Sequence, residues 1–295
     1  MLKPWPPNDS FSVINQARGS VDPDPMPGGA VKARLLAVLI LLATLPFASS
    51  AETAHVNGIE MHYTVQGTGE PLLLLHGFGS CSQNWAAEAA KLAGNYTVIS
   101  IDARGHGSST NPSGKFTHDQ AAADVVALMD ALNIKQARAM GFSSGGITLL
   151  HLATRHPDRL SKMVLIGAST HYPEQALAIL RDAAMDTLPP DVLEGFRKCA
   201  ANGEQQVRSL VDQFRAFGFG GDNTNFQAND LARITADTLI VHGDRDIFFP
   251  VAVPVAMYGA IKRSALWIVP NGEHEPTGGA APDDFMRTVE AFFSK

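Results

Sequence analysis

Several short runs of consecutive apolar residues stand out along the chain, and each ends in glycine or in polar residues. The first three are PLLLLHG, YTVISIDARG and KMVLIGAS, and DTLIVHG and ALWIVP follow nearer the C-terminus. A run of this kind is typical of a strand that is buried on both faces of a parallel sheet. The pattern therefore predicts a sheet that is covered by helices on both sides.

Other segments show the periodicities of helices and of a hairpin. THDQAAADVVALMDAL predicts a helix with Thr117 as its N-cap, and DDFMRTVEAFFSK predicts a closing helix. AHVNGIEMHYTVQ alternates like a strand and is broken by Asn57-Gly58, which is a hairpin signal. Strands that alternate with helices indicate an α/β fold with a doubly wound, mostly parallel sheet. Ligands of such sheets bind beyond the carboxyl ends of the strands.

One segment interrupts this alternation. From about position 171 to position 237 we find no strand pattern, and EQALAILRDAAMD, DVLEGFRKCA and EQQVRSLVDQFRAF read as helices. We interpret this stretch as a helical cap that is inserted between two strands of the sheet. It belongs to a single domain that we expect over residues 52–295.

Residues 1–51 are expected to be an N-terminal extension and a signal peptide. Two basic residues, Lys32 and Arg34, precede an uncharged apolar run and then small residues, which suit cleavage after Ser50 or Ala51. A start at Met26 would give the short basic region that is usual before such a run. We therefore expect an exported protein, periplasmic or secreted, with no stable membrane partner. The alternative is an uncleaved N-terminal anchor that holds the protein at the membrane.

Charge and cysteine content narrow the functional classes. The net charge of −6 gives no reason to expect nucleic acid as a partner. The two cysteines, Cys81 and Cys199, lie in the predicted core and in the predicted cap. We expect two partly buried free thiols; in an exported protein the alternative is a disulfide that ties the cap to the core.

The most informative motif is GFSSGG, between a predicted strand and a predicted helix. Its spacing Gly141-x-Ser143-x-Gly145 is that of a nucleophile elbow, in which a serine sits on a sharp turn. A serine hydroxyl needs a base, and the base needs an acid to orient it. In chain order after an elbow serine, the acid comes next and the histidine last. HGDRDIFFP offers Asp244 and Asp246 as the acid, and PNGEHEP offers His274 as the base.

The chain resembles the α/β-hydrolases that have a small helical cap. The resemblance covers about residues 54–294 and rests on HGFG, DARGHGSS, GFSSGG, HGDRDIFFP and GEHEP. It implies Ser143 as nucleophile, His274 as base and Asp246, a few residues before a proline, as acid. It also implies an oxyanion hole made by the backbone N–H groups of Phe78 and Ser144. GFSSGG is similar to the GFSTGG of cofactor-free haloperoxidases, which are esterases with a perhydrolase side activity.

We therefore expect a serine hydrolase that cleaves small carboxylic esters or lactones through an acyl-enzyme, with no cofactor and no metal ion. A small ester-like molecule is the expected partner. One alternative is a carbon–carbon bond hydrolase of diketones, and another is a non-catalytic or slow ligand-binding protein on the same fold. Structural roles are expected for His76 and His106, which would bind loop backbone. Arg104 is expected to form an ion pair, with Asp102 as the candidate partner.

Overall fold

The computed structural model describes residues 49–222, 224–277 and 282–294. The expected signal peptide and the expected start at Met26 lie outside these residues, apart from the end of the predicted cleavage region. That end, Ser50 and Ala51, forms the first two residues of strand β1.

The strands form one mixed sheet in the order β1-β2-β4-β3-β5-β6-β7-β8. Only the pairs β1–β2 and β2–β4 are antiparallel, and the others are parallel. The predicted hairpin is confirmed, because its turn residues Asn57 and Gly58 both have positive φ, 47° and 74°. The described strands are β1 (Ser50–Val56), β2 (Ile59–Gln66), β3 (Glu70–Leu75), β4 (Tyr96–Ile101), β5 (Ala137–Phe142), β6 (Leu160–Ile166), β7 (Asp237–Gly243) and β8 (Ser264–Val269).

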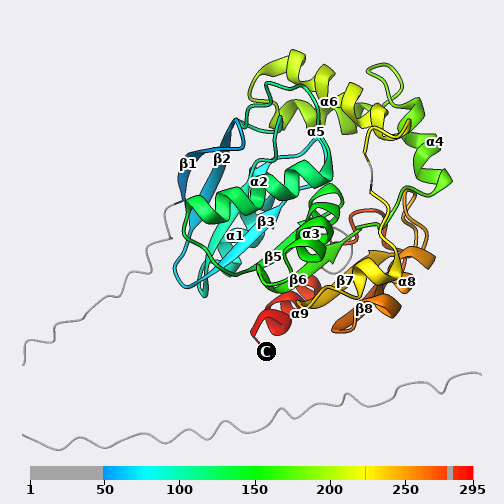
Figure 1. Ribbon diagram of the computed structural model, residues 1–295. Helices are drawn as coiled ribbons and strands as arrows, with labels where there is room; N and C mark the ends of the chain where they lie inside the picture. The colour runs from blue at the N-terminus through cyan, green and yellow to red at the C-terminus, as the bar shows by residue number, and fades with distance from the viewer. Residues whose placement is uncertain (1–48, 223, 278–281, 295) are drawn as a thin grey trace, which may run out of the picture. The chain divides into compact units, whose positions relative to one another are not determined.

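Helices cover both faces of this sheet (Figure 1). One face carries α1 (Ala86–Leu92) and α9 (Pro282–Ser294), and the other carries α2 (His118–Ala131), α3 (Ser144–Arg155) and α8 (Ala252–Ala260). The expected doubly wound α/β fold is thus confirmed. The sequence patterns did not predict α1, which has only seven residues, or α8, which contains a proline and a glycine and has no polar face.

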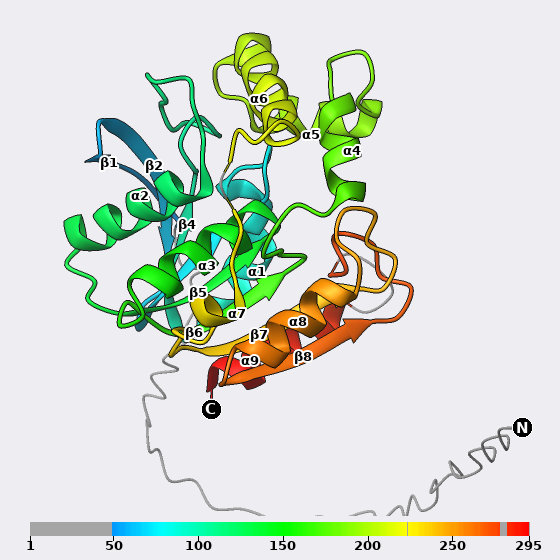
Figure 2. The ribbon, with the colours of Figure 1, turned by 45° about the vertical axis from the view of Figure 1, so that its right-hand side comes forward.

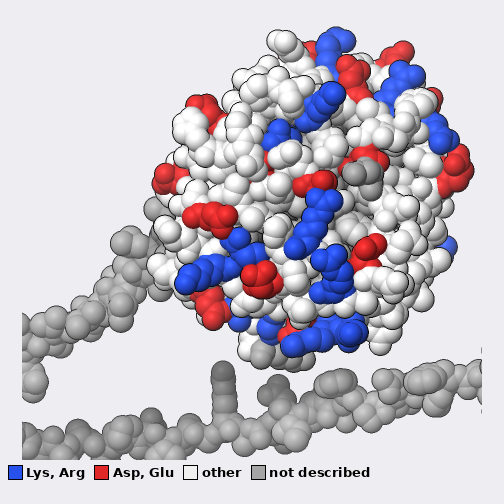
Figure 3. All heavy atoms as spheres, in the orientation of Figure 1, with Lys and Arg blue, Asp and Glu red and all other residues white. Residues whose placement is uncertain are grey.

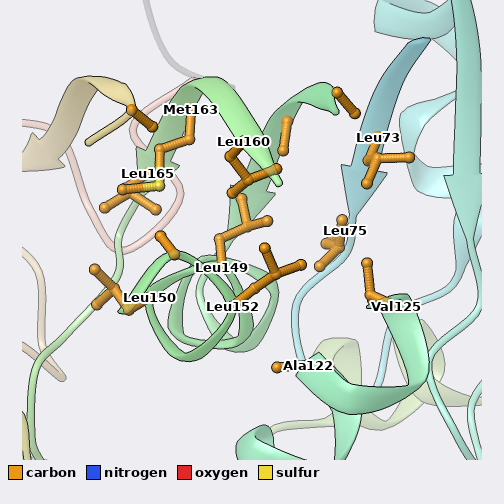
Figure 4. Close-up of a cluster of buried hydrophobic side chains, with 14 of the residues drawn as sticks. Leu73, Leu75, Ala122, Val125, Leu149, Leu150, Leu152, Leu160, Met163 and Leu165 are labelled. Carbon is orange, nitrogen blue, oxygen red and sulfur yellow. The ribbon is translucent and has the colours of Figure 1, made fainter. Parts of the chain in front are cut away.

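The run of four leucines in β3 shows how the two layers are built. Leu73 and Leu75 pack with α2 and α3, and Figure 4 shows them facing the leucines of α3. Leu72 and Leu74 point the other way and pack with α1 and α9. All four side chains are buried. An uninterrupted apolar run is therefore what a strand between two helical layers requires.

The segment between β6 and β7 forms the cap. It contains α4 (Glu174–Asp182), α5 (Pro190–Cys199), α6 (Gly203–Phe217) and the short α7 (Ala228–Leu231). The first three match the predicted helices, and α7 was not predicted. Figure 2 shows α4, α5 and α6 to one side of the sheet layers. α5 and α6 share an apolar cluster of their own, formed by Leu193, Phe196, Val207, Leu210 and Val211.

A disulfide joins the cap to the core. Cys81, in the loop after β3, is bonded to Cys199, at the end of α5, across 118 positions of sequence. The expectation of two free thiols was wrong, because the docking of the cap brings the two Cα atoms to 5.4 Å, a distance that a disulfide can bridge. Gln206 of α6 adds a second link, since its amide donates hydrogen bonds to the carbonyls of Gly105 and Gly107.

Acidic and basic side chains are interspersed on the face drawn in Figure 3. No helix within residues 49–222, 224–277 and 282–294 has the length and apolar character needed to cross a bilayer.

Candidate active site

The turn between β5 and α3 holds Ser143 in a strained backbone conformation. Its φ is 49° and its ψ is −114°, which is unusual for a residue with a side chain. The flanking glycines allow the strand and the helix to meet this closely. A Cβ on Gly141 would lie 2.6 Å from the backbone of Gly145, and a Cβ on Gly145 would lie 2.2 Å from the carbonyl oxygen of Leu75. The tight strand–turn–helix that the motif predicted is present.

The structure brings Ser143, His274 and Asp246 together in one hydrogen-bonded chain. Ser143 Oγ lies 2.9 Å from His274 Nε2, and His274 Nδ1 lies 2.8 Å from Asp246 Oδ2. The other candidate acid, Asp244, instead lies 3.9 Å from Arg245 Nε. The three residues follow β5, β8 and β7, so parallel strands deliver them to the same edge of the sheet.

Asp246 is held in its ionised form. Burial works against this charge, but the hydrogen bond with His274 and the backbone N–H groups of Phe248 and Phe249 outweigh it and lower the pKa of Asp246. An ionised Asp246 accepts a hydrogen bond from Nδ1–H of His274, so that Nε2 is free to accept a proton from Ser143. The arrangement therefore has the geometry to activate a serine hydroxyl.

Two backbone N–H groups lie beside Ser143 without a backbone acceptor. Ser144 is the first residue of α3, where helix N–H groups have no partner within the helix. Phe78 follows His76-Gly77, and within the part of the chain that the structure describes its N–H donates to no carbonyl or side chain. Both residues line the same cavity as Ser143 and His274. These are the two positions that the resemblance implied for an oxyanion hole.

The cavity lies between the cap and the strand ends and has a volume of about 410 Å³. Phenylalanines dominate its wall: Phe78, Phe142, Phe196, Phe214, Phe217, Phe248 and Phe249. Among the described residues that line it there is no lysine or arginine. A cavity of this size and character suits a small, largely apolar molecule.

The loop residues near the site act mainly on structure. His76 and His106 bind loop backbone, as expected: their Nδ1 atoms lie 2.7 Å and 3.0 Å from the carbonyls of Gly77 and Arg104. The expected ion pair of Arg104 is present, but its partner is not Asp102. Arg104 forms a buried bidentate pair with Asp124 of α2, at 2.7 and 2.8 Å.

The carboxylate of Asp102 has other hydrogen-bond partners. It accepts hydrogen bonds from the N–H groups of Ser82 and Ser108 and lies 3.0 Å from His62 Nδ1. These contacts use both oxygens, which is why Arg104 pairs with another residue.

A second Ser–His–Asp chain lies next to the first, and no motif in the sequence predicts it. His118 Nε2 lies 2.8 Å from Ser144 Oγ, and His118 Nδ1 lies 2.8 Å from Asp222 Oδ2. All three residues are buried. His118 and Asp222 are 104 positions apart, and neither belongs to a recognisable motif. Only the docking of the cap brings them together.

No group of three or more histidine, cysteine, aspartate or glutamate side chains in the described residues is arranged to hold a metal ion.

Comparisons of the sequence and of the structure with known proteins agree on one family. A family model described as the alpha/beta hydrolase fold matches residues 70–201. The chain is 33% identical over 264 residues to serine hydrolase BPHL of Mus musculus, covering 85% of this chain and 89% of that protein. It is 28% identical to the non-heme haloperoxidase of Rhodococcus erythropolis, covering 70% and 84%.

Among solved structures, the enol-lactonase from Burkholderia xenovorans LB400 is similar, with a TM-score of 0.67 and 25% identity. The match covers 83% of this chain and all of that one. These relatives share a hydrolase fold but differ in their named activities. The match to the mouse protein over nearly its whole length, together with the fold described above, leads to one conclusion. The chain belongs to the α/β-hydrolase family.

Proposed function

We propose that the protein is a serine hydrolase that cleaves small carboxylic esters and lactones through an acyl-enzyme on Ser143. The observation that carries this proposal is the continuous chain from Ser143 Oγ to His274 (2.9 Å) and from His274 to Asp246 (2.8 Å), which opens into an apolar cavity. The likeness to an enol-lactonase structure adds support for lactones.

In the first half of the proposed reaction, Ser143 Oγ attacks the ester carbonyl while its proton passes to His274 Nε2. The carbonyl oxygen becomes an anion between the N–H groups of Phe78 and Ser144. Preorganised donors of this kind contribute about 3–4 kcal/mol each to the transition state. His274 then gives the proton to the leaving alcohol, and Ser143 carries the acyl group.

In the second half, His274 takes a proton from a water molecule, which attacks the acyl-enzyme. As the bond between the acyl carbon and Ser143 Oγ breaks, His274 returns the proton to Ser143 Oγ and the acid leaves. This step needs a histidine that water can reach. The side chain of His274 is 20% exposed, whereas that of Asp246 is fully buried. The charge of Asp246 stabilises the imidazolium that forms in both halves.

The first test is turnover of para-nitrophenyl acetate, butyrate and octanoate and of a small lactone. We expect hydrolysis of these small esters, and the dependence of kcat/KM on acyl length measures how much of the cavity of about 410 Å³ the acyl group can fill. Ser143→Ala should lower kcat by about 10⁴–10⁶-fold. Ser209→Ala, an exposed serine of α6, is the matched control.

The second test locates the nucleophile. A fluorophosphonate should form one adduct, on the peptide that contains Ser143, and Ser143→Ala should remain unlabelled. A folded wild-type protein that turns over none of these substrates would contradict the proposal, and cleavage of a diketone by that protein would favour carbon–carbon hydrolysis.

We further propose that the protein is exported. The basic–apolar–small order of residues 31–51 supports this, and so does the Cys81–Cys199 disulfide, since disulfides persist in oxidising compartments. Thiol alkylation and mass analysis of protein taken from the periplasm or medium should find no free cysteine and a chain that begins near Glu52. A protein recovered only with membranes would indicate an uncleaved anchor.

A further inference from the structure

The second chain, Ser144–His118–Asp222, ends in the same cavity as the first. Ser144 and His118 line that cavity together with Ser143 and His274. His118 is 1% exposed and lies between aromatic rings: Phe116 at 5.3 Å and Phe217 at 5.4 Å between centroids. A buried imidazole in such surroundings is held in one orientation.

The contacts with Asp222 determine which nitrogen of His118 donates a hydrogen bond and which accepts one. Both the backbone N–H and Nδ1 of His118 contact this carboxylate, at 3.1 and 2.8 Å. The hydroxyls of Thr224 and Tyr172 donate to it as well. Burial opposes the charge of Asp222, but the hydrogen bonds of His118 and Thr224 outweigh it and lower the pKa well below its usual range.

Because Nδ1 of His118 faces the carboxylate of Asp222, the neutral imidazole carries its proton on Nδ1 and accepts at Nε2. Ser144 therefore donates its hydroxyl proton to His118. This leaves the lone pairs of Ser144 Oγ as a fixed hydrogen-bond acceptor at the floor of an apolar cavity.

The position of this acceptor relative to a substrate follows from covalent geometry. Within the proposed function, on which this inference rests, the N–H of Ser144 binds the carbonyl oxygen of the ester. The Oγ of the same residue lies about 3 Å from that nitrogen. It can therefore reach only groups that lie within a few bonds of the scissile carbonyl.

We propose that Ser144 Oγ selects acyl groups that carry a hydroxyl at the 2- or 3-position. A hydroxyl supplies the single proton that the acceptor requires. Without such a donor, Ser144 Oγ is left facing an apolar group. The preferred substrates are therefore esters of small 2- or 3-hydroxy acids, or lactones that carry a further free hydroxyl at one of these positions.

Charged groups fit this position less well. A carboxylate would meet the lone pairs of Ser144, with no lysine or arginine among the described lining residues to compensate it. An ammonium would lose its hydration against a neutral oxygen, since four donors already occupy the carboxylate of Asp222 behind His118. Glu275 also lines the cavity, but its side chain is exposed to solvent.

The test is a ratio of two substrates measured within one protein, so that any general loss of activity cancels. We compare kcat/KM for ethyl lactate with kcat/KM for ethyl propionate, and methyl 3-hydroxybutyrate with methyl butyrate. In Ser144→Ala, which keeps the backbone N–H, we expect the ratio of at least one pair to fall by about 5- to 10-fold. Ser144→Thr, which restores a hydroxyl, should recover part of it.

Ser80→Ala is the matched control, because this serine also lines the cavity, whereas the hydrogen bonds of the His118 ring within the described residues go to Asp222 and Ser144. Its ratios should stay within about two-fold of wild type. Circular dichroism on each variant verifies the fold. Ratios that do not change in Ser144→Ala would overturn the inference, as would a preference for alanine ethyl ester over lactate that depends on Ser144. The absence of turnover on all four esters would instead contradict the proposed function itself.

Discussion

The two Ser–His–Asp chains of this protein have nearly the same dimensions and very different surroundings. The serine–histidine distances are 2.9 and 2.8 Å, and both histidine–aspartate distances are 2.8 Å. However, the His274 side chain is 20% exposed and that of His118 only 1%. Hydrogen-bond geometry alone therefore does not distinguish a nucleophile from a fixed acceptor.

Backbone geometry and access to water make the distinction. Ser143 stands on a strained turn with φ of 49°, which presents its hydroxyl to the cavity, whereas Ser144 already belongs to α3. Asp246 and His274 come from loops of the core, while Asp222 belongs to the segment that returns from the cap. We conclude that the first chain suits turnover, and the second suits recognition.

The largest expected effect is the difference in kcat between variants in which one of the two aspartates is replaced. Asp246→Asn should lower kcat on ethyl propionate by about 10⁴-fold, because the imidazolium of His274 loses its charged partner. Asp222→Asn should lower it by no more than about 10-fold, since His118 does not change protonation during the proposed reaction. Steady-state kinetics on both variants measure this.

Thermal unfolding of the two aspartate variants is the necessary control, because both carboxylates are buried. An equally large loss of kcat in a well-folded Asp222→Asn protein would show that the second chain takes part in proton transfer, and the comparison would then fail.

The second prediction concerns the disulfide. Replacing Cys81 and Cys199 by serine should lower the free energy of unfolding by about 2–5 kcal/mol, because the bond closes a long loop in the unfolded chain. Urea denaturation followed by circular dichroism measures this change. Wild type in reducing buffer should have the same free energy of unfolding as the variant. A difference below about 1 kcal/mol between oxidised wild type and the variant would contradict the prediction.

The same variant sharpens the comparison. Since Asp222 belongs to the segment leaving the cap, loosening the cap should reduce the lactate-to-propionate ratio more than it reduces the hydrolysis of propionate.

The third prediction is a loss of stability in weak acid. Burial lowers the pKa of His106 to about 3 and that of His151, which lies beside the second chain, to about 4. In the unfolded chain both take up protons near pH 6.5. Between pH 6.5 and these lowered pKa values, the unfolded state binds more protons than the folded state. The free energy of unfolding therefore falls as the pH falls, by up to about 1.4 kcal/mol per pH unit for each histidine.

Urea denaturation at pH 7.5, 6 and 5 measures this slope. His151→Gln, which keeps a hydrogen-bonding group near Thr224, should make the slope shallower below pH 6. If wild type and variant show the same pH dependence, His151 is not a buried neutral histidine.

The parts of the structure that the sequence predicts are those that depend on local pattern and on strand order. The leucines of β3 require two covered faces, and GFSSGG requires a tight turn. Asp246 and His274 follow strands whose carboxyl ends meet Ser143 at one edge of the sheet. Topology brings both candidate acids, Asp244 and Asp246, to this edge, and the choice of Asp246 came from the resemblance to the α/β-hydrolases.

The parts that the sequence did not predict depend on how distant segments dock. Cys81–Cys199, His118–Asp222 and Arg104–Asp124 each join residues that no local periodicity relates. Asp102 was the expected partner of Arg104 because it is close in sequence, but backbone N–H groups already occupy its oxygens. Such pairings follow from side-chain competition in three dimensions.

The disulfide also restrains the cap at one point. It fixes the C-terminal end of α5, where the ring of Phe196 also packs over Gly79, leaving no space for a Cβ there. The other end of α5, about 10 Å away, carries Val192. Val192 and Ile247 line the cavity and are 37% and 61% exposed, so they mark its entrance. The disulfide thus holds the C-terminal end of α5 against the core, while the exposed residues at the cavity entrance lie near its N-terminal end.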